Sequence, residues 1–449
     1  MLRTRIGKIG IALLAVPALQ LIFASFLPAN ATESNLSAAD NTLILTSSAL
    51  VLLMTPGLAF FYGGFTQAKN VLNTMAMSFV MMGIATLVWS IIGFSLAFSD
   101  GGASNAFIGN PSTYAFLENL PSNWEGLQIP GLSFALFQGM FAIITPALIS
   151  GALVERISFR FWCFFTPIWI LLVYAPLAHM VWGGGLLGKD LDFAGGTVVH
   201  ISSGVSALVL AGLIGSRSNW PKGIKPPHDI TQILIGTGLL WFGWFGFNGG
   251  SQLSVNGAEL PFTTTHVSAA AGLVAWASIE SIKDGKSTAV GMATGAVAGL
   301  VGITPAAGFV SPGSGMLIGA ITSALCYLSV QLKIKLSFDD SLDTFAVHGV
   351  GGTAGALLTG FFAKSELIAS HPAGLVLEEQ GRMALISGQF QAVLIAYGIA
   401  AIGTFVIAIV LKSLGCNFRV NNSEEQSGLD ISQHGEEAYM EKTGSPSAT

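Results

Sequence analysis

The sequence predicts an all-α membrane protein with eleven transmembrane helices, arranged as a five-plus-five inverted repeat followed by a final helix. Of its 449 residues, 52% are hydrophobic and only 10% are charged, whereas soluble domains carry about 25% charged residues. A chain of this composition cannot cover its surface with groups that water solvates, so a lipid bilayer is its expected solvent. The net charge of -5 gives no indication of a nucleic-acid partner.

Residues 1–31 have the organisation of a secretory signal peptide. Three basic residues within the first eight positions precede an apolar run, 9–27, and the small residues Ala29 and Ala31 follow. This order is typical of a cleavable signal. The alternative is an uncleaved first helix, because the length of the run suits both interpretations. In either case residue 32 is expected on the outer face, and N-terminal sequencing of the mature protein distinguishes the two.

Eleven apolar stretches of about 20 residues follow, each long enough to cross a bilayer as a helix. They cover residues 41–65, 71–98, 132–154, 160–181, 197–216, 230–250, 262–282, 288–305, 314–333, 344–363 and 388–412. The eighth is rich in Gly and Ala and gives the weakest signal. Together they predict a membrane domain over residues 40–412. The polar residues 413–449 have the composition of a flexible tail, and we predict a cytoplasmic regulatory tail there.

The positions of Lys and Arg predict the orientation of the chain. Loops on the side reached by the first span, together with the tail, contain 13 basic residues, and the opposite side contains three. Because cytoplasmic loops carry the excess of positive charge, the N-terminus is predicted outside and the C-terminus inside. We therefore expect a multi-pass protein of the cell (inner or plasma) membrane.

Two histidines open corresponding spans in similar sequence. His200 opens the fifth span and His348 the tenth, and both fit the pattern His-x3-Gly-x2-(Ala or Gly). Five crossings later the chain runs in the opposite sense, so the repeat is inverted. Ionisable side chains within membrane spans are energetically costly, so a matched pair indicates a functional site shared by two half-repeats. The alternative is that each ring is a neutral packing residue bonded to a backbone carbonyl.

The chemistry of paired imidazoles limits what they can serve. Burial favours the neutral ring, and two neutral rings can bond to each other, one donating and one accepting. Such a narrow polar line suits a small neutral hydrogen-bonding cargo or a proton relay. It does not suit a hydrated alkali cation, which needs a ring of oxygens.

Aromatic side chains lie at the predicted outer ends of spans. Phe137 and Phe141 are early in the third span, and Trp182 ends the fourth. The electron-rich face of such a ring attracts a desolvated cation by up to about 2 kcal/mol. The alternative is an interfacial belt that faces lipid headgroups. Ser251, at the outer end of the sixth span, adds a hydroxyl that can accept from an ammonium-like donor.

Acidic residues precede both histidine-bearing spans. Asp192 is placed to cap the His200 helix and to interact with the positive end of its dipole. The acidic group before the His348 span, Asp339, Asp340 and Asp343, has the same interpretation. Carboxylates ahead of both spans also favour cations over anions.

Signatures of metal, cofactor and catalytic chemistry are lacking in the sequence. The paired histidines have no third ligand within their spans, which gives weak support for a metal. Cys163, Cys326 and Cys416 are far apart and form no CxxC motif, and we interpret them as small apolar fillers. Because no Walker loop, nucleophile elbow or dinucleotide fingerprint is present, we expect no cofactor, no metal and no enzymatic activity.

Seven motifs occur in order along the chain. They are Pro56–Gly64 with Lys69 and Asn70, Gln138–Phe141, Ala178–Gly185, Asp192–His200, Gly243–Asn248, Gly299–Pro305 and Asp340–Gly351. Together they resemble the ammonium transporter (Amt/Mep/Rh) family, in particular its bacterial-type Amt branch. The resemblance covers nearly all of residues 40–440, and an ordered set of seven motifs is far more specific than any one of them.

The resemblance implies roles for individual residues of the pathway. The outer ammonium-binding site corresponds to Phe137, Phe141, Trp182 and Ser251. The stacked gate corresponds to Phe141 and Phe247, the pore lining to His200 and His348, and the supporting positions to Asp192, Thr304, Asp340 and Asp343. The implied activity is uptake of ammonium, with methylammonium as an analogue. NH4+ is deprotonated and NH3 is conducted, with or without a co-transferred proton, by a homotrimer with one pore per subunit.

The tail also resembles the bacterial family members. The matching residues are Gly428, Asp430, His434, Gly435, Glu436 and Tyr439. In those relatives the tail couples subunits and docks the PII nitrogen-signalling protein. Two other functions remain as alternatives. An alkali-cation channel would need a carbonyl filter motif, which is lacking, and a non-transporting ammonium sensor would need a signalling module, for which about 37 tail residues are too few.

Overall fold

The computed structural model describes residues 35–223, 225–372 and 381–439, so the predicted signal peptide lies outside the described residues. Ordered structure within these ranges is helical, and no strand occurs among them. One isolated β-bridge joins Ile157 to Arg419 and ties the chain after the last long helix to the segment before Phe159. The all-α prediction is therefore confirmed for the part of the chain that is described.

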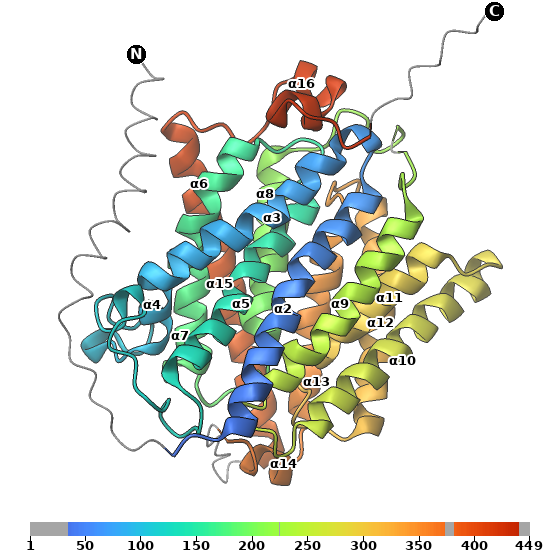
Figure 1. The fold of residues 1–449 in the computed structure, drawn as a ribbon. Coiled ribbons are helices and arrows are strands. Elements are labelled where there is room, and N and C mark those ends of the chain that lie inside the picture. Colours follow the sequence, from blue (N-terminus) through green and yellow to red (C-terminus); the bar gives the residue numbers. More distant parts are fainter. Residues whose placement is uncertain (1–34, 224, 373–380, 440–449) are drawn as a thin grey trace, which may run out of the picture. The chain divides into compact units, whose positions relative to one another are not determined.

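The helices follow one another along the chain in the order shown in Figure 1. They are α2 (Ala38–Phe65), α3 (Val71–Val88), α4 (Phe94–Phe98), α5 (Gly131–Ile149), α6 (Phe159–Trp169), α7 (Ala175–Trp182), α8 (Ser202–Ile214), α9 (Ile230–Gly250), α10 (Glu259–Asp284), α11 (Ala289–Ile303), α12 (Pro312–Lys335), α13 (Gly351–Phe362), α14 (Ser365–Ala369), α15 (Gly381–Ser413) and α16 (Asn422–Ser427).

Four π-helical turns interrupt or open these helices. Trp89–Gly93 joins α3 to α4, and Ile170–Tyr174 joins α6 to α7. Gly196–Ile201 leads into α8 and contains His200, and Phe345–Val350 leads into α13 and contains His348. The two histidines thus share an uncommon local geometry, which in other proteins is frequent at functional sites.

All eleven predicted spans are helical, and nine described segments are long and apolar enough to cross a membrane. These nine are Ala38–Phe65, Ala68–Phe98, Gly131–Ala152, Phe159–Trp182, Gly196–Ile214, Ile230–Gly250, Pro312–Lys335, Phe345–Phe362 and Gly381–Ser413. The helix α11 is apolar but has only 15 residues, and α10 has 26 residues with a more polar sequence. The last helix is described from Gly381, seven residues before the predicted start, and its Arg382 donates to the carbonyl oxygen of Gly360.

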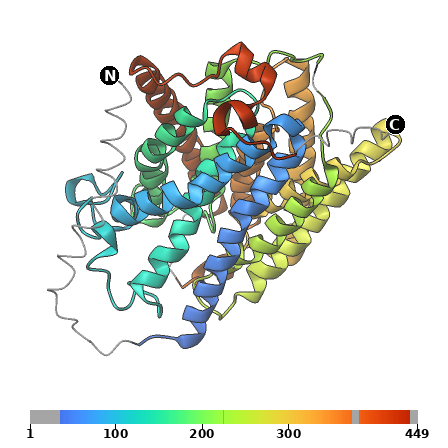
Figure 2. The ribbon, with the colours of Figure 1, turned by 45° about the horizontal axis from the view of Figure 1, so that its top comes forward.

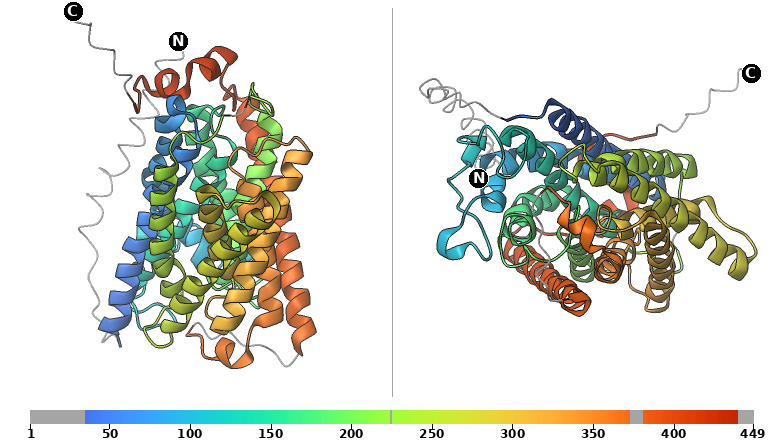
Figure 3. Two further views of the ribbon diagram at one scale, coloured as in Figure 1. Left: turned by 90° about the vertical axis from the view of Figure 1, so that its right-hand side faces the viewer. Right: turned by 90° about the horizontal axis from the view of Figure 1, so that it is seen from below.

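The long helices pack side by side, with the tail across one end of the bundle. The helix α2 runs along α9, and α10, α11 and α12 form a group at one side (Figures 1 and 3). The helix α16 and the turn Asp430–His434 lie over the end of the bundle where α3 begins (Figure 2). This is the end that the basic residues predict to be inside.

Small residues allow the backbones of the two half-repeats to meet at the histidines. A Cβ atom on Gly204 of α8 would lie 2.2 Å from the backbone nitrogen of Gly349, beside His348. A Cβ atom on Gly352 would lie 2.9 Å from the Cβ of His200. Close helix contact through small residues is the common mode of association within a bilayer, and here it sets the distance between the rings.

We predict that Gly204→Ala destabilises the protein, because the added methyl group meets backbone atoms that cannot rotate away. Overpacking of this kind costs about 1–3 kcal/mol. Thermal unfolding of the detergent-purified chain, followed by size-exclusion chromatography after heating, measures the loss. Gly83→Ala in α3 is the matched control, because nothing lies within 4 Å of its Cβ position. Equal unfolding temperatures for the two variants would contradict the proposed contact.

Candidate functional site

Asp192 fixes the start of the helix that carries His200. Its carboxylate accepts hydrogen bonds from the backbone N–H groups of Gly195 (2.8 Å), Gly196 (2.6 Å) and Thr197 (2.8 Å), and from the hydroxyl of Thr197. Gly195 has φ +118°, which an L side chain rarely adopts. The predicted cap is therefore confirmed, and the carboxylate neutralises the positive end of this helix.

Asp340 does the same for the helix that carries His348. Its carboxylate accepts from the backbone N–H groups of Thr344 (3.0 Å) and Phe345 (2.7 Å). Burial raises the pKa of Asp340 to about 6, although the charge of Lys333 and the two backbone bonds oppose that rise. The prediction of a cap is confirmed for this residue.

Asp339 and Asp343, the two acidic residues near Asp340, have other partners, so the cap interpretation is wrong for them. Asp339 binds the guanidinium groups of Arg217 and Arg156, and Asp343 pairs with Lys333. The reason is geometric. Asp343 has φ +59° and its carbonyl, not its carboxylate, accepts from the helix, at the N–H of Val347.

The two histidine rings face each other between α8 and α13. Their Nδ1 atoms are 3.2 Å apart, and the ring centroids are separated by 5.2 Å at an interplanar angle of 28°. Both side chains are buried. The Nε2 atom of His200 is buried without a hydrogen-bond partner among the described residues. In a neutral pair the shared Nδ1 contact uses one proton, so one Nε2 atom donates and the other accepts.

A small cavity lies beside this pair. Its volume is about 10 Å³, which is close to the minimum that holds one water-sized molecule. Its walls are almost entirely apolar, and the two histidines supply its ionisable groups. The lining residues are Met54, Leu58, Phe61, Ile144, Leu148, Val199, His200, Leu240, Trp244, Phe247, Val297 and His348. We call this space the dry passage.

Aromatic rings lie at the end of the dry passage that is predicted to face outside. Phe141 and Phe247 have centroids 4.3 Å apart, which brings the predicted gate pair into contact. The ring of Trp244 stacks on His200 at 5.5 Å, and its Nε1 donates to the hydroxyl of Thr304 at 2.9 Å. Thr304 thus supports the passage through Trp244. This tryptophan had no separate predicted role, although it lies in the motif that contains Phe247.

A larger cavity lies on the other side of this aromatic pair, and we call it the outer vestibule because it lies at the end predicted to be outside. Its volume is about 400 Å³, and Phe141, Trp182 and Ser251 are among its lining residues. The indole nitrogen of Trp182 donates to the carbonyl oxygen of Asp192 at 2.8 Å, which couples the ring to the cap of the His200 helix. The hydroxyl of Ser251 donates to the carbonyl oxygen of Phe247 at 2.8 Å, so its oxygen is left to accept.

Phe137 differs from the other three residues expected in the outer site. It is fully buried, packs edge-on against Phe141 with centroids 5.0 Å apart, and does not line the outer vestibule. Instead the lining includes the buried His371, whose Nε2 lies 3.3 Å from the carbonyl oxygen of Ser251. Nothing in the sequence pattern around His371 indicated this position, because it follows α14 in a loop outside the seven motifs.

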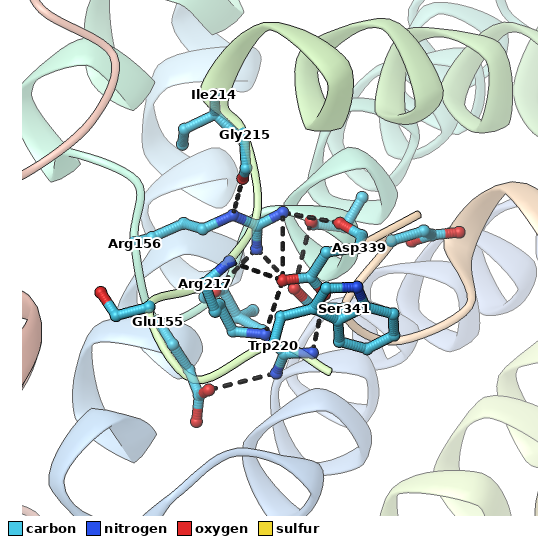
Figure 4. A network of polar contacts seen from close by, with 12 residues as sticks. Glu155, Arg156, Ile214, Gly215, Arg217, Trp220, Asp339 and Ser341 are labelled. Carbon is cyan, nitrogen blue, oxygen red and sulfur yellow. Dashed lines mark hydrogen bonds and ion pairs between the residues drawn. The ribbon is translucent and has the colours of Figure 1, made fainter. Parts of the chain in front are cut away.

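A buried ionic network joins three loops at the opposite end of the pathway (Figure 4). The guanidinium of Arg217 binds both carboxylate oxygens of Asp339, at 2.8 and 3.0 Å, and Glu155 at 3.1 Å. Burial would raise the pKa of Asp339, but the bonds and charge of Arg217 and the charge of Arg156 outweigh it and hold the pKa below its usual value. Paired and fully bonded charges of this kind are costly to break singly.

Arg156 holds the backbone of the same loops. Its guanidinium donates to the carbonyl oxygens of Gly215 (2.7 Å) and Asp339 (2.7 Å) and to the hydroxyl of Ser341 (2.5 Å). Burial lowers the pKa of Arg156 to about 10, so the group stays charged near neutral pH. Both arginines are among the 13 basic residues that predict the orientation of the chain, but sequence spacing alone does not show which loops meet.

The tail folds back onto these loops, which its polar composition did not predict. The carboxylate of Asp430 accepts from the backbone N–H groups of Leu72 (3.0 Å) and Asn73 (2.8 Å) and caps α3. The Nε2 atom of His434 lies 3.0 Å from Oδ1 of Asn73, and its ring packs on Phe159. The expectation of a flexible segment is therefore wrong for residues 414–439.

The other tail positions differ in how closely they are held. Gly428 and Gly435 have φ of +108° and +72°, which favour glycine. The hydroxyl of Tyr439 lies 3.5 Å from Nε2 of His228, and Glu436 is exposed. Glu425, which no motif singled out, accepts from the N–H of Ser218 at 2.7 Å beside the ionic network.

The described residues contain no group of three or more His, Cys, Asp or Glu side chains that could hold a metal ion. The polar groups of the pathway can instead bind a small cation at the outer vestibule and a small hydrogen-bonding molecule in the dry passage.

Comparisons with known proteins agree with this arrangement. Residues 42–439 match the Ammonium Transporter Family. An ammonium transporter of Bacillus subtilis (strain 168) is 44% identical over 409 residues, which are 90% of this chain and 98% of that protein. The crystal structure of Saccharomyces cerevisiae Mep2 is similar with a TM-score of 0.83 at 35% identity, over 92% of this chain and 93% of that one. A structure described as a sensor Amt protein gives 0.81 at 29% identity, over 88% and 98%.

We predict that Asp430→Asn loosens the docked tail. The amide presents an NH2 group toward two backbone N–H donors, and a hydrogen bond to a charged group contributes about 1.5–3 kcal/mol. Hydrogen exchange of residues 422–439 should become at least several-fold faster. Glu437→Gln is the matched control, because that side chain is exposed. Unchanged protection in Asp430→Asn would show that the carboxylate does not hold the tail.

Proposed function

The chain belongs to the ammonium transporter family, and from that premise we propose that it binds NH4+ at the outer vestibule and conducts NH3 past the paired histidines. Ammonium transport is the activity of the family. The observation that carries the finer proposal is the contrast between the two cavities. One is roomy and has carboxylates in its lining, and the other is nearly dry and contains a pair of facing imidazoles.

Recruitment takes place at Trp182, Phe141 and Ser251. The ring faces attract the cation and the hydroxyl oxygen accepts an N–H bond, because its own proton is already donated to Phe247. Phe137 supports the ring of Phe141 from behind.

Loss of the proton follows from the energetics of the dry passage. A charged group without compensating partners in an apolar interior costs several kcal/mol even after relaxation, and a cation–π contact returns only about 2 kcal/mol. NH4+ therefore transfers a proton to water in the outer vestibule, which becomes hydronium, and NH3 passes the gate. Its lone pair accepts from one Nε2 atom and an N–H donates to the other, so neither imidazole is left unpaired.

The same reasoning accounts for selectivity against K+. An alkali ion cannot lose a proton, and the dry passage has no ring of oxygens to replace its water. An alkali-cation channel is therefore the weaker alternative.

The proposal extends to the assembly and topology that the resemblance implies. The chain crosses the cell membrane eleven times as a five-plus-five inverted repeat with a final helix, with its N-terminus outside after removal of residues 1–31. Each subunit of a homotrimer contains one pathway. The inner tail docks on the loops of the ionic network, where a PII signalling protein can reach it. The 13 inner basic residues and the contacts of Asp430 support this arrangement.

Transport itself is tested by isotope uptake. Proteoliposomes containing the chain should accumulate labelled methylammonium, ammonium should compete, and K+ should not. Expression should restore growth of a transporter-deleted host on limiting ammonium. Failure to restore growth by a well-expressed, folded chain would favour the sensor alternative. A current on an ammonium pulse would show that the proton follows the cargo, and uptake without current would show that it stays behind.

The paired histidines are tested by His348→Ala. Loss of one imidazole leaves His200 without its Nδ1 partner. We expect methylammonium flux to fall at least about tenfold, or K+ to be admitted. A tenfold fall in flux corresponds to an increase of about 1.4 kcal/mol in the barrier. His266→Ala is the matched control, because His266 is exposed on α10 and lies outside the pathway lining. Normal flux and selectivity in His348→Ala would return this residue to a packing role.

A further inference from the structure

We propose that the outer vestibule is a binding site for quaternary ammonium ions, which occupy it without passing the gate and so block ammonium uptake. The inference deepens the proposed function, because it depends on the outer vestibule being the entrance to the pathway. It depends in part on the loop between α4 and α5, residues 99–130, which the ammonium site does not use and which we call the outer loop.

The size of the outer vestibule exceeds what an ammonium ion needs. A cavity of about 400 Å³ lies within the range that holds drug-sized molecules. The dry passage offers about 10 Å³, and the gate rings between the two spaces lie 4.3 Å apart. A cation with four alkyl groups on nitrogen fits the first space and is excluded from the second.

The walls of the outer vestibule form an aromatic enclosure. Trp124 of the outer loop stacks on Phe134 with centroids 4.5 Å apart and an interplanar angle of 14°. Phe98 packs edge-on against both rings, and Trp182 faces the space from α7. Cages of this kind are the usual means of binding quaternary ammonium groups, whose charge is spread over methyl groups.

The outer loop that carries Trp124 is held in place by backbone bonds. The N–H of Trp124 donates to the carbonyl oxygen of Ile129 at 2.9 Å, and the N–H of Leu127 donates back to Trp124 at 2.9 Å. The N–H of Ser37 also donates to Gln128 at 2.8 Å, which anchors the loop to the start of α2. The backbone that carries this lining ring is therefore held in place.

The charge of the lining favours a cation. Glu125, Asp190 and Asp192 line the outer vestibule, and no Lys or Arg lies among its described lining residues. Asp192 is saturated by the helix start that it caps, which leaves Glu125 and Asp190 to act on a ligand. Burial raises the pKa of Asp190 to about 6, so it is mostly ionised at pH 7.5. The exposed Lys189 adjoins it but is not part of the lining.

Quaternary ions and ammonium differ in one contact. Ser251 offers a hydrogen-bond acceptor, which ammonium uses and a quaternary nitrogen cannot, because it has no N–H. The two ligands should therefore depend on different residues within one cavity. Ammonium should depend on Ser251, and the quaternary ion should depend on Trp124 and Glu125.

The probe is choline, compared with 3,3-dimethylbutan-1-ol, the uncharged molecule in which carbon replaces nitrogen. In proteoliposomes at pH 7.5, choline should raise the apparent KM for methylammonium without lowering the maximal rate, and labelled choline should not accumulate. The alcohol should have no effect at the same concentration. Trp124→Leu should raise the inhibition constant of choline about fivefold, and Glu125→Gln about twofold.

Matched variants separate the binding site from a general effect on the loop. Trp124→Phe should retain inhibition, and Glu118→Gln should leave it unchanged, because Glu118 is an exposed carboxylate of the same loop outside the lining. Ser251→Ala should weaken methylammonium transport and leave the choline constant unaltered. Inhibition of normal uptake by the alcohol as strongly as by choline would overturn the inference, and so would equal choline constants in the wild type, Trp124→Leu and Glu125→Gln.

Different measurements test the choline site and the proposed transport function, so one can fail without the other. If methylammonium uptake is absent, the transport proposal fails, and titration of choline into the purified chain by tryptophan fluorescence still tests the site. A change that saturates for choline, does not occur with the alcohol and is weakened in Glu125→Gln supports the inference. No saturable change, or one that the alcohol reproduces, overturns it.

Discussion

Two buried carboxylates, Asp192 and Asp340, fix the helix starts on which the paired histidines depend. Each accepts the free backbone N–H groups at the start of a π-helical turn, and each turn contains one of the two rings. Without these acceptors several donors would be left unpaired in a buried region, at a cost of about 1–3 kcal/mol each. The rings can face each other at 3.2 Å only because both helices begin at defined positions.

Contacts beside these two carboxylates connect the histidine helices to the two ends of the pathway. The carbonyl of Asp192 accepts from Trp182, so the ring that we propose binds ammonium and the His200 helix share one anchor. Asp339, directly before Asp340, is bound by Arg217 in the inner network. Glu425 of the tail binds Ser218, the residue after Arg217. The tail and the His348 helix therefore rest on adjacent residues of the same two loops.

Much of this arrangement could be predicted from the sequence, since it rests on local rules. Apolar stretches locate the helices, and a carboxylate a few residues before a helix predicts a cap, which holds for Asp192 and Asp340. The same rule fails for Asp339 and Asp343, because arginine and lysine side chains from distant segments compete for those carboxylates. The docked tail was missed for a related reason. Its stability comes from Asp430 and His434 meeting α3 and Phe159, contacts that composition cannot show.

The sequence also does not show how deeply a side chain is buried within the fold. Phe137 and Phe141 lie one helical turn apart, and both were expected at the outer site, yet only Phe141 reaches the cavity. A helix presents residues four apart on one face, but whether both meet the same space depends on what covers that face. Here Gly250 of α9 lies beside the ring of Phe137 and buries it. The aromatic contacts of Trp124 with Tyr114 and Phe134 also could not be predicted, because none of these residues belongs to a motif.

The division of the pathway into two unlike spaces determines what can be selected. On the proposed mechanism an ion in the roomy outer vestibule keeps part of its water, and ring faces and carboxylates distinguish cations from anions but separate ammonium poorly from other monocations. The dry passage separates them by a different property. With about 10 Å³ and two imidazoles it rejects charge, since a lone ion there costs several kcal/mol, more than the cation–π contacts at the entrance return. On the proposed mechanism, selectivity therefore comes from the ability of the cargo to release a proton, and not from the tightness of the outer site. An outer site that binds other cations is compatible with this, because a bound ion that cannot deprotonate is held at the gate and goes no further.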